Sequence, residues 1–346
     1  MSRETLLRSL GDSHCHLDVN CSNDDIDQLA QLFNSPHFVV NNRINYFHIM
    51  TTYHLDLQLL DRLLNQLNDN IVVPYFGVHP WYSHLFTTVK YDVNDNDNIK
   101  QLHYNSVLNP PPSPELLQIL PDPINLDDHI NNIETLITTY QSKFTYGIGE
   151  IGLDKLFRVP MNGYFGNQMY PNNGDIKLSP CKVTIDHQLK VFELQLSLAN
   201  RLHKQISVHC VKAHGLLFDT IPKYTNISNI ILHSFSGSID QGIRWINQYK
   251  SNNQQRLYFS FSNWINGADN KRDLLQNLIP KLNQNQILIE TDISIDRFLL
   301  QKSTMATQDE YFQHLIDIYT KICHIRDWKP YEMNDSILQN LTHSII

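Results

Sequence analysis

Two histidines near the start of the chain stand at a spacing that suits metal binding. They lie in the run Asp12-Ser13-His14-Cys15-His16-Leu17-Asp18. If this run is extended, its side chains alternate between two faces, so His14 and His16 point to the same side. Two imidazoles on one side can hold a divalent metal ion. The pair alone is equally typical of two ordinary histidines near a strand end, so further ligands have to come from elsewhere in the chain.

Polar residues also follow five later apolar runs. They are His79, Glu150, His209, His233 and Asp292. In a barrel of parallel strands the carboxyl ends of all strands meet at one mouth, so residues distant in sequence lie together there. Imidazoles mixed with carboxylates suit borderline divalent metals. A satisfied core histidine explains one such position but not six strand ends together, and the sequence therefore predicts a metal site.

The elements that would position these residues alternate regularly. We expect one strand that ends in the His14–His16 run and seven more at residues 46–50, 71–78, 145–149, 205–208, 230–232, 257–261 and 286–289. Apolar residues spaced three and four apart predict helices over 24–33, 55–67, 126–140, 185–203, 216–224, 239–249, 271–282 and 308–324. Eight strands alternating with eight helices predict a parallel α/β fold, and the number eight favours a TIM barrel.

Size and hydrophobicity are compatible with one such barrel. We expect residues 1–346 to form a single TIM-barrel metallohydrolase domain. The hydrophobic fraction of 41% supplies a large core, and no apolar run approaches the roughly 18 residues that cross a bilayer. We therefore expect no membrane partner. The N-terminal residues lack an apolar leader region, so we expect no secretory signal.

Cysteine content and charge point to a compartment and limit the partners. The five cysteines are scattered and form no C-x-x-C pair, which predicts reduced thiols in the cytoplasm or the nucleus. The formal charge of −8 counts against tight, non-specific binding of nucleic acid by the whole surface. Bound divalent cations would offset part of this charge at a site.

Two stretches interrupt the alternation. Residues 90–115 hold an Asp/Asn run and a proline-rich run with few apolar residues, so we expect a mobile surface insertion. Residues 158–181 scatter aromatic residues among Gly, Asn and Pro shortly after Glu150. This second insertion either covers the site as a loop or is a plain surface excursion, and the sequence leaves both open.

A rival motif surrounds Glu150. Residues Gly147 to Gly152 match G-x-G-x-x-G after a strand, the pattern of a dinucleotide-binding turn. However, a pyrophosphate needs positive potential, and Glu150 places a negative charge inside the loop. The residues that follow include Pro160 and do not begin a helical pattern. We interpret these glycines as residues that allow tight packing around a strand end.

Several runs, in order, resemble the TatD family of metal-dependent hydrolases. They are Asp12–Asp18, Gly77–Pro80, Gly149–Asp154, Val208–Cys210, Leu232–Gly237 and Ile289–Asp292, and Leu338–Leu341 resembles the family's final Asn-containing helix. Residues 155–160 and 209–215 are closest to a fungal branch, which is associated by name with a TPR-repeat subunit of the anaphase-promoting complex. The resemblance implies a TIM barrel of the amidohydrolase type with one or two divalent ions, Mg²⁺, Mn²⁺ or Zn²⁺, at its mouth.

The resemblance also implies roles for the polar residues. One ion would be held by His14, His16 and Asp292, the other by His209 and His233, with Glu150 bridging the two. The implied reaction is phosphodiester hydrolysis of DNA, which two neighbouring cations suit because they activate water and neutralise the phosphate. Glu150 and Asp292 would then be catalytic, with Asp292 the general base, and His79 would contact the phosphate.

The substrate-facing residues depart from the family pattern. After the fifth-strand histidine the family usually has Cys-Arg-Asp-Ala, whereas this chain has Cys210-Val211-Lys212-Ala213. Lys212 is a substrate-binding candidate that offers a point charge instead of a bidentate guanidinium. Ile293 and Ser294 follow Asp292 where the family has a small residue and Pro. Two alternatives therefore stay open: hydrolysis of another ester or amide on the same metal centre, and a role as a binding partner of the helical-repeat subunit.

Overall fold

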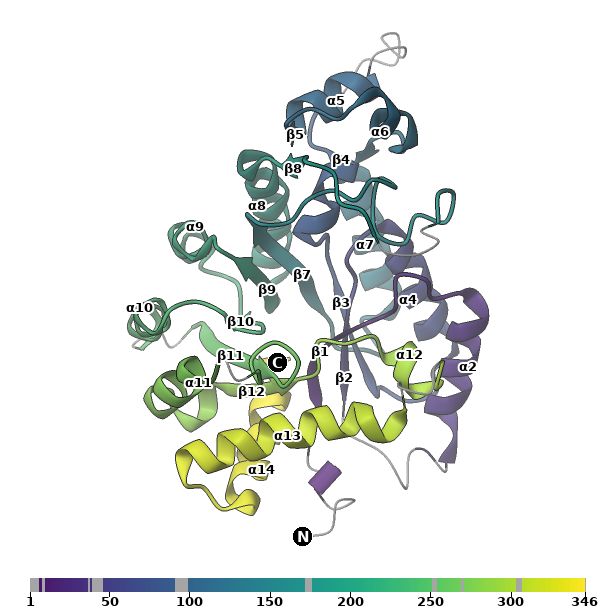
Figure 1. Ribbon diagram of the computed structural model, residues 1–346. Coiled ribbons are helices and arrows are strands. Elements are labelled where there is room, and N and C mark those ends of the chain that lie inside the picture. Colours follow the sequence, from purple (N-terminus) through teal and green to yellow (C-terminus); the bar gives the residue numbers. More distant parts are fainter. Residues whose placement is uncertain are drawn as a thin grey trace.

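Eight parallel strands form a ring at the centre of the molecule in this computed structural model, which describes residues 6–345 apart from 8–9, 37, 39–45, 91–98, 172–175, 251–253, 269–270 and 303–306 (Figure 1). The strands of the ring are, in spatial order, β1 (Asp12–His16), β2 (Phe47–Met50), β3 (Val72–Phe76), β7 (Gly147–Asp154), β9 (Ile206–Val211), β10 (Asn229–Leu232), β11 (Arg256–Ser262) and β12 (Ile287–Glu290). Every printed pair between neighbours is parallel. The predicted eight-stranded α/β architecture is confirmed.

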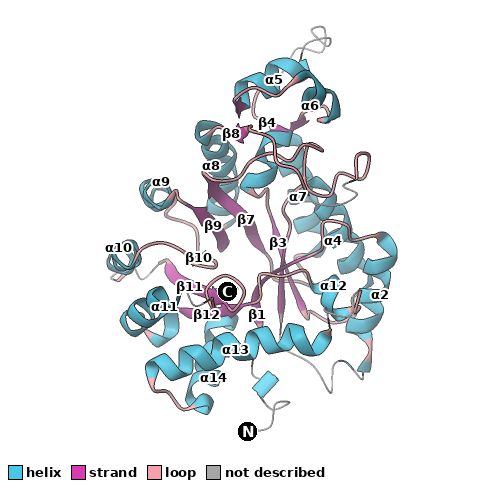
Figure 2. Cartoon of the chain, in the orientation of Figure 1, coloured by secondary structure: helices cyan, strands magenta, loops and turns pink. Residues whose placement is uncertain are grey.

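Helices surround this ring on its outer side (Figure 2). The eight main helices are α2 (Asn23–Asn34), α4 (His54–Gln66), α7 (Leu126–Tyr140), α8 (Ile185–Leu202), α9 (His214–Thr220), α10 (Ile239–Tyr249), α11 (Arg272–Leu278) and α13 (Gln308–Arg326). Two further helices, α12 (Ile295–Leu299) and α14 (Pro330–Ser344), lie near the C-terminus of the chain. The eight predicted helices are present. Those expected over 216–224 and 271–282 end early, in the 3₁₀ turns Ile221–Lys223 and Ile279–Lys281. Pro222 and Pro280 lack the N–H that an α-helix would use there.

The first and last strands of the ring meet through main-chain hydrogen bonds. Asp292 N donates to His14 O at 2.9 Å, and His16 N donates to Ile293 O at 3.0 Å. The buried Asp12 carboxylate reinforces this junction, since its Oδ1 accepts from the backbone nitrogens of both His14 and Thr291 at 3.0 Å. These bonds bring the two ends of the strand order, far apart in the sequence, into one corner of the barrel mouth.

The strands are buried on both faces, which explains their nearly continuous apolar sequences. Inside the ring, Met50, Tyr75, Ile231, Tyr258 and Leu288 pack together and fill the barrel. The larger cluster lies between the outer faces of the strands and the surrounding helices. Among the described residues, no helix has both the length and the apolar character that a bilayer span requires.

The insertion at 90–115 is a packed unit in the part that the structure describes. Residues 91–98 lie outside the described residues, but α5 (Ile99–Val107), β5 (Leu108–Asn109) and α6 (Pro114–Ile119) follow in order and lie together beyond the ring of strands, at the top of the view in Figure 1. Tyr104, Val107 and Leu116 share a small apolar core with Val159 and Cys181 of the second insertion. The expectation of a poorly packed segment is therefore wrong for 99–115, because the few apolar residues are shared between the two insertions.

The second insertion supports the mouth without entering the cavity. The short strand β8 (Lys182–Val183) that follows it pairs with β5, and Pro160 pairs with Leu178 across the loop. The ring centroid of Phe165 lies 5.6 Å from that of Trp81, a residue of the cavity wall. None of the described residues of 158–181 lines the cavity. The insertion therefore packs behind the wall of the site.

Candidate metal centre

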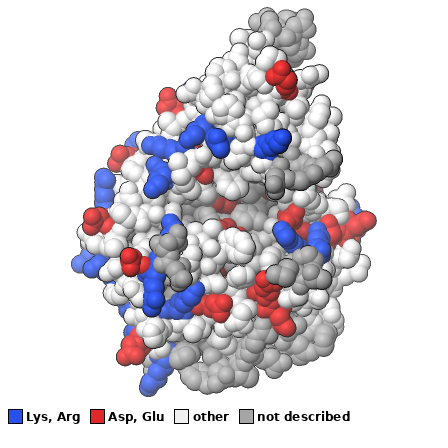
Figure 3. Space-filling view, in the orientation of Figure 1, with Lys and Arg blue, Asp and Glu red and all other residues white. Residues whose placement is uncertain are grey.

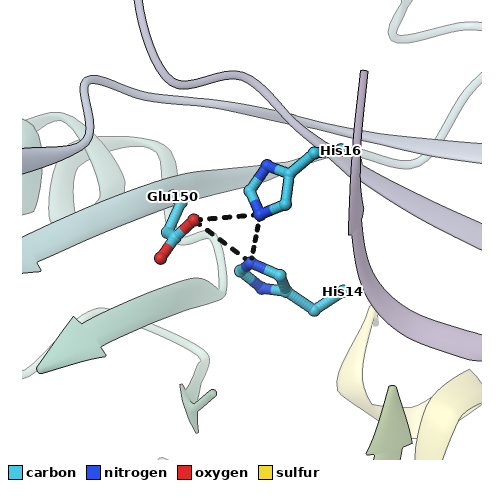
Figure 4. A group of neighbouring side chains, drawn as sticks. All are labelled: His14, His16 and Glu150. Atoms are coloured by element: carbon cyan, nitrogen blue, oxygen red, sulfur yellow. Dashed lines mark hydrogen bonds and ion pairs between the residues drawn. The ribbon is translucent and has the colours of Figure 1, made fainter. Parts of the chain in front are cut away.

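Glu150 lies at the centre of the cluster of histidines. Its Oε2 is 3.2 Å from His14 Nε2 and 3.2 Å from His16 Nε2, and these two nitrogens are 3.1 Å apart (Figure 4). Its other oxygen, Oε1, is 3.2 Å from His79 Nε2, 2.9 Å from His209 Nδ1 and 3.0 Å from His233 Nε2. Each oxygen of one carboxylate therefore faces its own set of imidazole nitrogens.

Asp292 completes the first set. Its Oδ1 lies 3.5 Å from His16 Nε2 and 3.9 Å from His14 Nε2, and its side chain is 17% exposed toward the cavity. Its φ of 59° is in the left-handed region, which Asp tolerates better than most residues. This turn of the backbone directly after β12 lets the carboxylate face the histidines of β1. The structure thus brings together all six residues expected to hold metal.

His79 lies closer to the centre than a phosphate contact alone requires. Its Nε2 is within 3.2 Å of Glu150 Oε1, and its ring is 4.3 Å from the ring of His209. Burial lowers the pKa of His79 to about 4. A neutral imidazole at this distance can donate a hydrogen bond to a phosphate oxygen or offer a lone pair to a cation.

Strand geometry explains why these side chains converge. In β1 alternate residues share a face, so His14 and His16 both point into the mouth while Cys15 is buried on the other face. In β7 a glycine is required beside the site. Gly152 has φ of +151°, and a Cβ there would lie 2.0 Å from His209 O on β9. The absence of a side chain lets the two strands carrying Glu150 and His209 approach each other.

The second ring nitrogen of three histidines is also held. His14 Nδ1 lies 2.9 Å from Ser207 Oγ, His233 Nδ1 lies 3.2 Å from Glu290 Oε1, and His209 Nε2 lies 3.4 Å from Asp154 Oδ2. Such contacts fix the ring orientation and the tautomer of a metal-binding histidine. The sequence did not predict the orienting role of Ser207, Asp154 and Glu290, because contacts between side chains of different strands depend on how the strands pack.

The neighbouring side chains keep the carboxylates of Glu150 and Asp154 ionised. Burial raises the pKa of Glu150, but the charges and hydrogen bonds of the surrounding imidazoles outweigh this and hold it well below its usual range. Burial also raises the pKa of Asp154, and hydrogen bonds from His209 and Trp81 reverse the effect. The centre therefore presents ionised carboxylates to a ring of imidazoles.

This donor set fits divalent metal ions. His14 Nε2 and His16 Nε2 face each other at 3.1 Å, and only one of two such nitrogens can donate a hydrogen to the other. A cation between them would accept lone pairs from both nitrogens and from Glu150 Oε2. Imidazole nitrogen with carboxylate oxygen is the set that Zn²⁺, Mn²⁺ and related ions prefer. The chemistry of the residues present thus agrees with the predicted centre.

The centre opens into a cavity of about 430 Å³. Figure 3 shows this face of the molecule hollowed near its middle, with acidic side chains inside and Lys and Arg side chains around it. Much of the wall is apolar, with contributions from Leu17, Trp81, Val211, Trp264 and Ile293. Lys212 is exposed and has φ of 56°, and Val211, not Lys212, is among the described residues that line the cavity.

Comparison with known proteins places this barrel in a family. A family model described as TatD related DNase matches residues 11–344. The chain belongs to the TatD family. Cut9-interacting protein scn1 of Schizosaccharomyces pombe is 30% identical over 291 residues, which cover 75% of this chain and 80% of that protein. Uncharacterized deoxyribonuclease YMR262W of Saccharomyces cerevisiae is 35% identical over 259 residues, which cover 72% of this chain and 75% of that protein.

A solved TatD structure shares the fold. YjjV, a TatD homolog from Escherichia coli K12, superposes with a TM-score of 0.57 at 17% identity and covers 98% of both chains. Both the glycine pattern Gly147–Gly152 and the TatD-like run Gly149–Asp154 lie within the continuous strand β7 (Gly147–Asp154), so no helix follows the glycines as a dinucleotide-binding turn requires. The rejection of that rival reading from sequence agrees with the structure.

Proposed function

We propose that this protein is a metal-dependent hydrolase that cleaves phosphodiester bonds in DNA. The observation that carries the proposal is the placement of Glu150, whose two oxygens face two separate sets of imidazole nitrogens about 3 Å away. A carboxylate in this position suits a bridge between two cations. The name of the relative YMR262W, a deoxyribonuclease, supports DNA as the substrate.

The ligands divide into two groups around that bridge. His14, His16 and Asp292 would hold one ion, and His209 and His233 the other, with Mg²⁺, Mn²⁺ and Zn²⁺ as the candidates. When bound, such ions supply Lewis-acid chemistry that activates water and neutralises phosphate charge. The two ions are expected to bind in one catalytic domain that spans residues 1–346.

The remaining chemistry belongs to side chains at the cavity. Asp292 presents its carboxylate both to the histidines of β1 and to the cavity, so it can accept the proton of an attacking water. Hydrogen bonding to His16 and the nearby imidazoles hold the pKa of Asp292 below its usual value, although burial acts to raise it. His79 lines the same cavity and is positioned to hydrogen-bond a phosphate oxygen.

Metal analysis and activity of the purified protein test this proposal. We expect one or two divalent ions per chain and cleavage of DNA with at least one of Mg²⁺, Mn²⁺ and Zn²⁺. Asp292→Ala should lower activity by at least 1,000-fold, on the order expected when a catalytic group is removed, while Asp219→Ala, at an exposed helix position, should not. Equal activity of Asp292→Ala and the parent protein would refute the assignment.

A different ester or amide substrate on the same centre is the second candidate. The observation that favours it is the apolar wall, where Val211 and Ile293 occupy positions that in the family usually hold Arg and a small residue. A screen of phosphodiesters, phosphomonoesters, carboxylic esters and amides with the metal-loaded protein distinguishes the two. Activity confined to nucleic acid would eliminate this candidate.

A partner role can coexist with catalysis. We propose that the insertions at 90–115 and 158–181 contact a TPR-repeat subunit of the anaphase-promoting complex. A relative that carries the name Cut9-interacting protein scn1 supports a partner role in general. Five free cysteines support a location in the cytoplasm or nucleus, where thiols are kept reduced. Co-precipitation with and without the insertions tests the contact, and imaging of the tagged chain tests the location. Undiminished binding after deletion of both insertions would exclude them as the contact surface.

A further inference from the structure

Trp264 is an aromatic residue left largely open to solvent at the mouth of the cavity. Its side chain is 60% exposed, yet it lines the same cavity as His233 and Asp292. It follows β11 directly, at the carboxyl end of the barrel where the other site residues lie. An exposed indole beside a metal centre offers a flat aromatic face on which a ligand can stack.

The turn that carries Trp264 is held firmly. Asn266 Oδ1 accepts from Ser262 N at 2.9 Å, and Asn266 Nδ2 donates to Phe235 O at 3.0 Å. Ile265 N donates to Ser262 Oγ at 3.0 Å, and Asn266 N donates to Ser262 O at 2.9 Å. A turn tied in this way presents its side chain in a fixed place, which lowers the entropy cost of binding.

Other groups brace the outer side of the same turn. His314 lies 5.8 Å from the Trp264 ring, nearly perpendicular to it at 82°. Lys321 Nζ donates to Asn263 Oδ1 at 2.7 Å and to Gly267 O at 3.0 Å. These contacts support the indole from α13 and leave much of its surface free.

Trp81, on another part of the cavity wall, is already occupied by neighbours. Its ring stacks on Phe157 at 5.4 Å and 13°, and its Nε1 donates to Asp154 Oδ2 at 2.7 Å. Trp81 is therefore a fixed part of the wall. Trp264 lacks such a stacked partner among the described residues, so it is the indole available to a ligand.

The rim near β7 and β9 is cationic. Lys155 and Lys212 are both exposed, and Lys155 N donates to Val211 O at 3.1 Å, which places these strand ends side by side. Lys182 Nζ donates to Lys155 O at 3.3 Å and brings a third cation to the same rim. Point charges of this kind attract a phosphate backbone without reading its sequence.

We propose that Trp264 is a stacking platform for an unpaired nucleobase next to the phosphate at the metal centre. This inference rests on the proposed function and names how its substrate is held. The apolar wall beside Trp264 suits the π-face of any base, so stacking here is tolerant of sequence. A base can reach the indole only when it is unpaired, so the site selects strand ends and single strands over intact duplex.

Substitutions at Trp264, assayed with matched oligonucleotides, test the proposal in the full-length, metal-loaded protein. One single-stranded substrate carries a normal base at the nucleotide next to the cleaved bond, and the other carries an abasic sugar there. We expect Trp264→Ala to lower kcat/KM on the normal strand by about 5- to 150-fold, the range for loss of one stacked base. Trp264→Phe should retain most activity, and the abasic strand should be cleaved equally by all three proteins.

The matched control and a binding measurement separate the possible outcomes. Tyr170→Ala removes another exposed aromatic residue, one outside the cavity wall, and should leave both substrates unaffected. If the parent protein neither binds nor cleaves either strand, with binding followed by fluorescence anisotropy, the proposed function and this inference both fail. If the parent cleaves DNA but Trp264→Ala has no effect, or affects the abasic strand equally, only the stacking role is refuted.

Discussion

Glu290 is the residue whose substitution tests most directly how the centre is organised. It is fully buried, and its Oε1 accepts hydrogen bonds from Ser234 N at 2.7 Å and Ser234 Oγ at 2.6 Å and lies 3.2 Å from His233 Nδ1. Glu290→Gln keeps the shape and an accepting oxygen but removes the negative charge. The variant therefore weakens the hold on His233 without touching a predicted ligand.

The size of the effect follows from these three contacts. A hydrogen bond to a charged group contributes about 1.5–3 kcal/mol and one between neutral groups about 0.5–1.5 kcal/mol. Each contact should thus weaken by about 1 kcal/mol. Only the bond to His233 acts on the metal, and about 1.4 kcal/mol is a factor of ten in affinity. A change of about 1 kcal/mol is about 5-fold, so we expect the ion held by His209 and His233 to bind about 5-fold more weakly, just below the roughly 10–100-fold range for such orienting contacts.

Calorimetric titration of the metal-free protein with Mn²⁺ measures this change. His233→Ala serves as the reference for loss of a ligand, and it should abolish one of the binding events. Glu193→Gln, the same substitution on α8 away from the centre, should bind like the parent protein. Circular dichroism and thermal unfolding without metal show whether each variant retains the fold.

One result would refute the reasoning. If Glu290→Gln folds and binds Mn²⁺ within twofold of the parent while His233→Ala loses a site, then Glu290 does not orient His233 for binding. The contact would then serve only to hold the turn after β10 against the end of β12. A loss as large as that of His233→Ala would instead indicate that the carboxylate itself is a ligand.

Two further predictions concern the framework. Gly152→Ala should destabilise the fold by more than about 3 kcal/mol in urea unfolding, because the new Cβ meets His209 O at 2.0 Å and φ of +151° strains any side chain; unchanged stability would contradict this. Burial lowers the pKa values of His84 and His187 from 6.5 to about 4, so both stay neutral when folded. The contribution of the two neutral imidazoles to the free energy of unfolding is complete above pH 6.5, and it falls by up to about 3 kcal/mol for each as the pH drops to 4. In urea unfolding, the double variant His84→Gln/His187→Gln should therefore show a free energy of unfolding that depends less on pH than that of the parent protein.

The sequence predicted the barrel because its signals are local. Alternation of short β-branched runs with helical patterns depends on each segment's own burial, so every strand of the ring and the eight main helices around it were predicted, whereas the short helix α12 was not. The insertion at 99–115 was misjudged because its apolar residues, such as Tyr104, pack against Val159 from a distant segment. Counting apolar residues within one stretch misses a core that two stretches share.

Residue type and strand-end position determined which side chains could be ligands, since only His, Asp and Glu offer the right donor atoms and parallel strands share one mouth. Only the tertiary structure decided how they divide. The two oxygens of Glu150 separate the histidines into two sets, and this depends on the register between β1, β7, β9 and β10. The tertiary structure also decided that Val211, and not Lys212, lines the cavity, and that Trp264 is exposed at the edge of this cavity. A sequence pattern specifies faces and ends of elements, but side-chain distances arise from packing between elements.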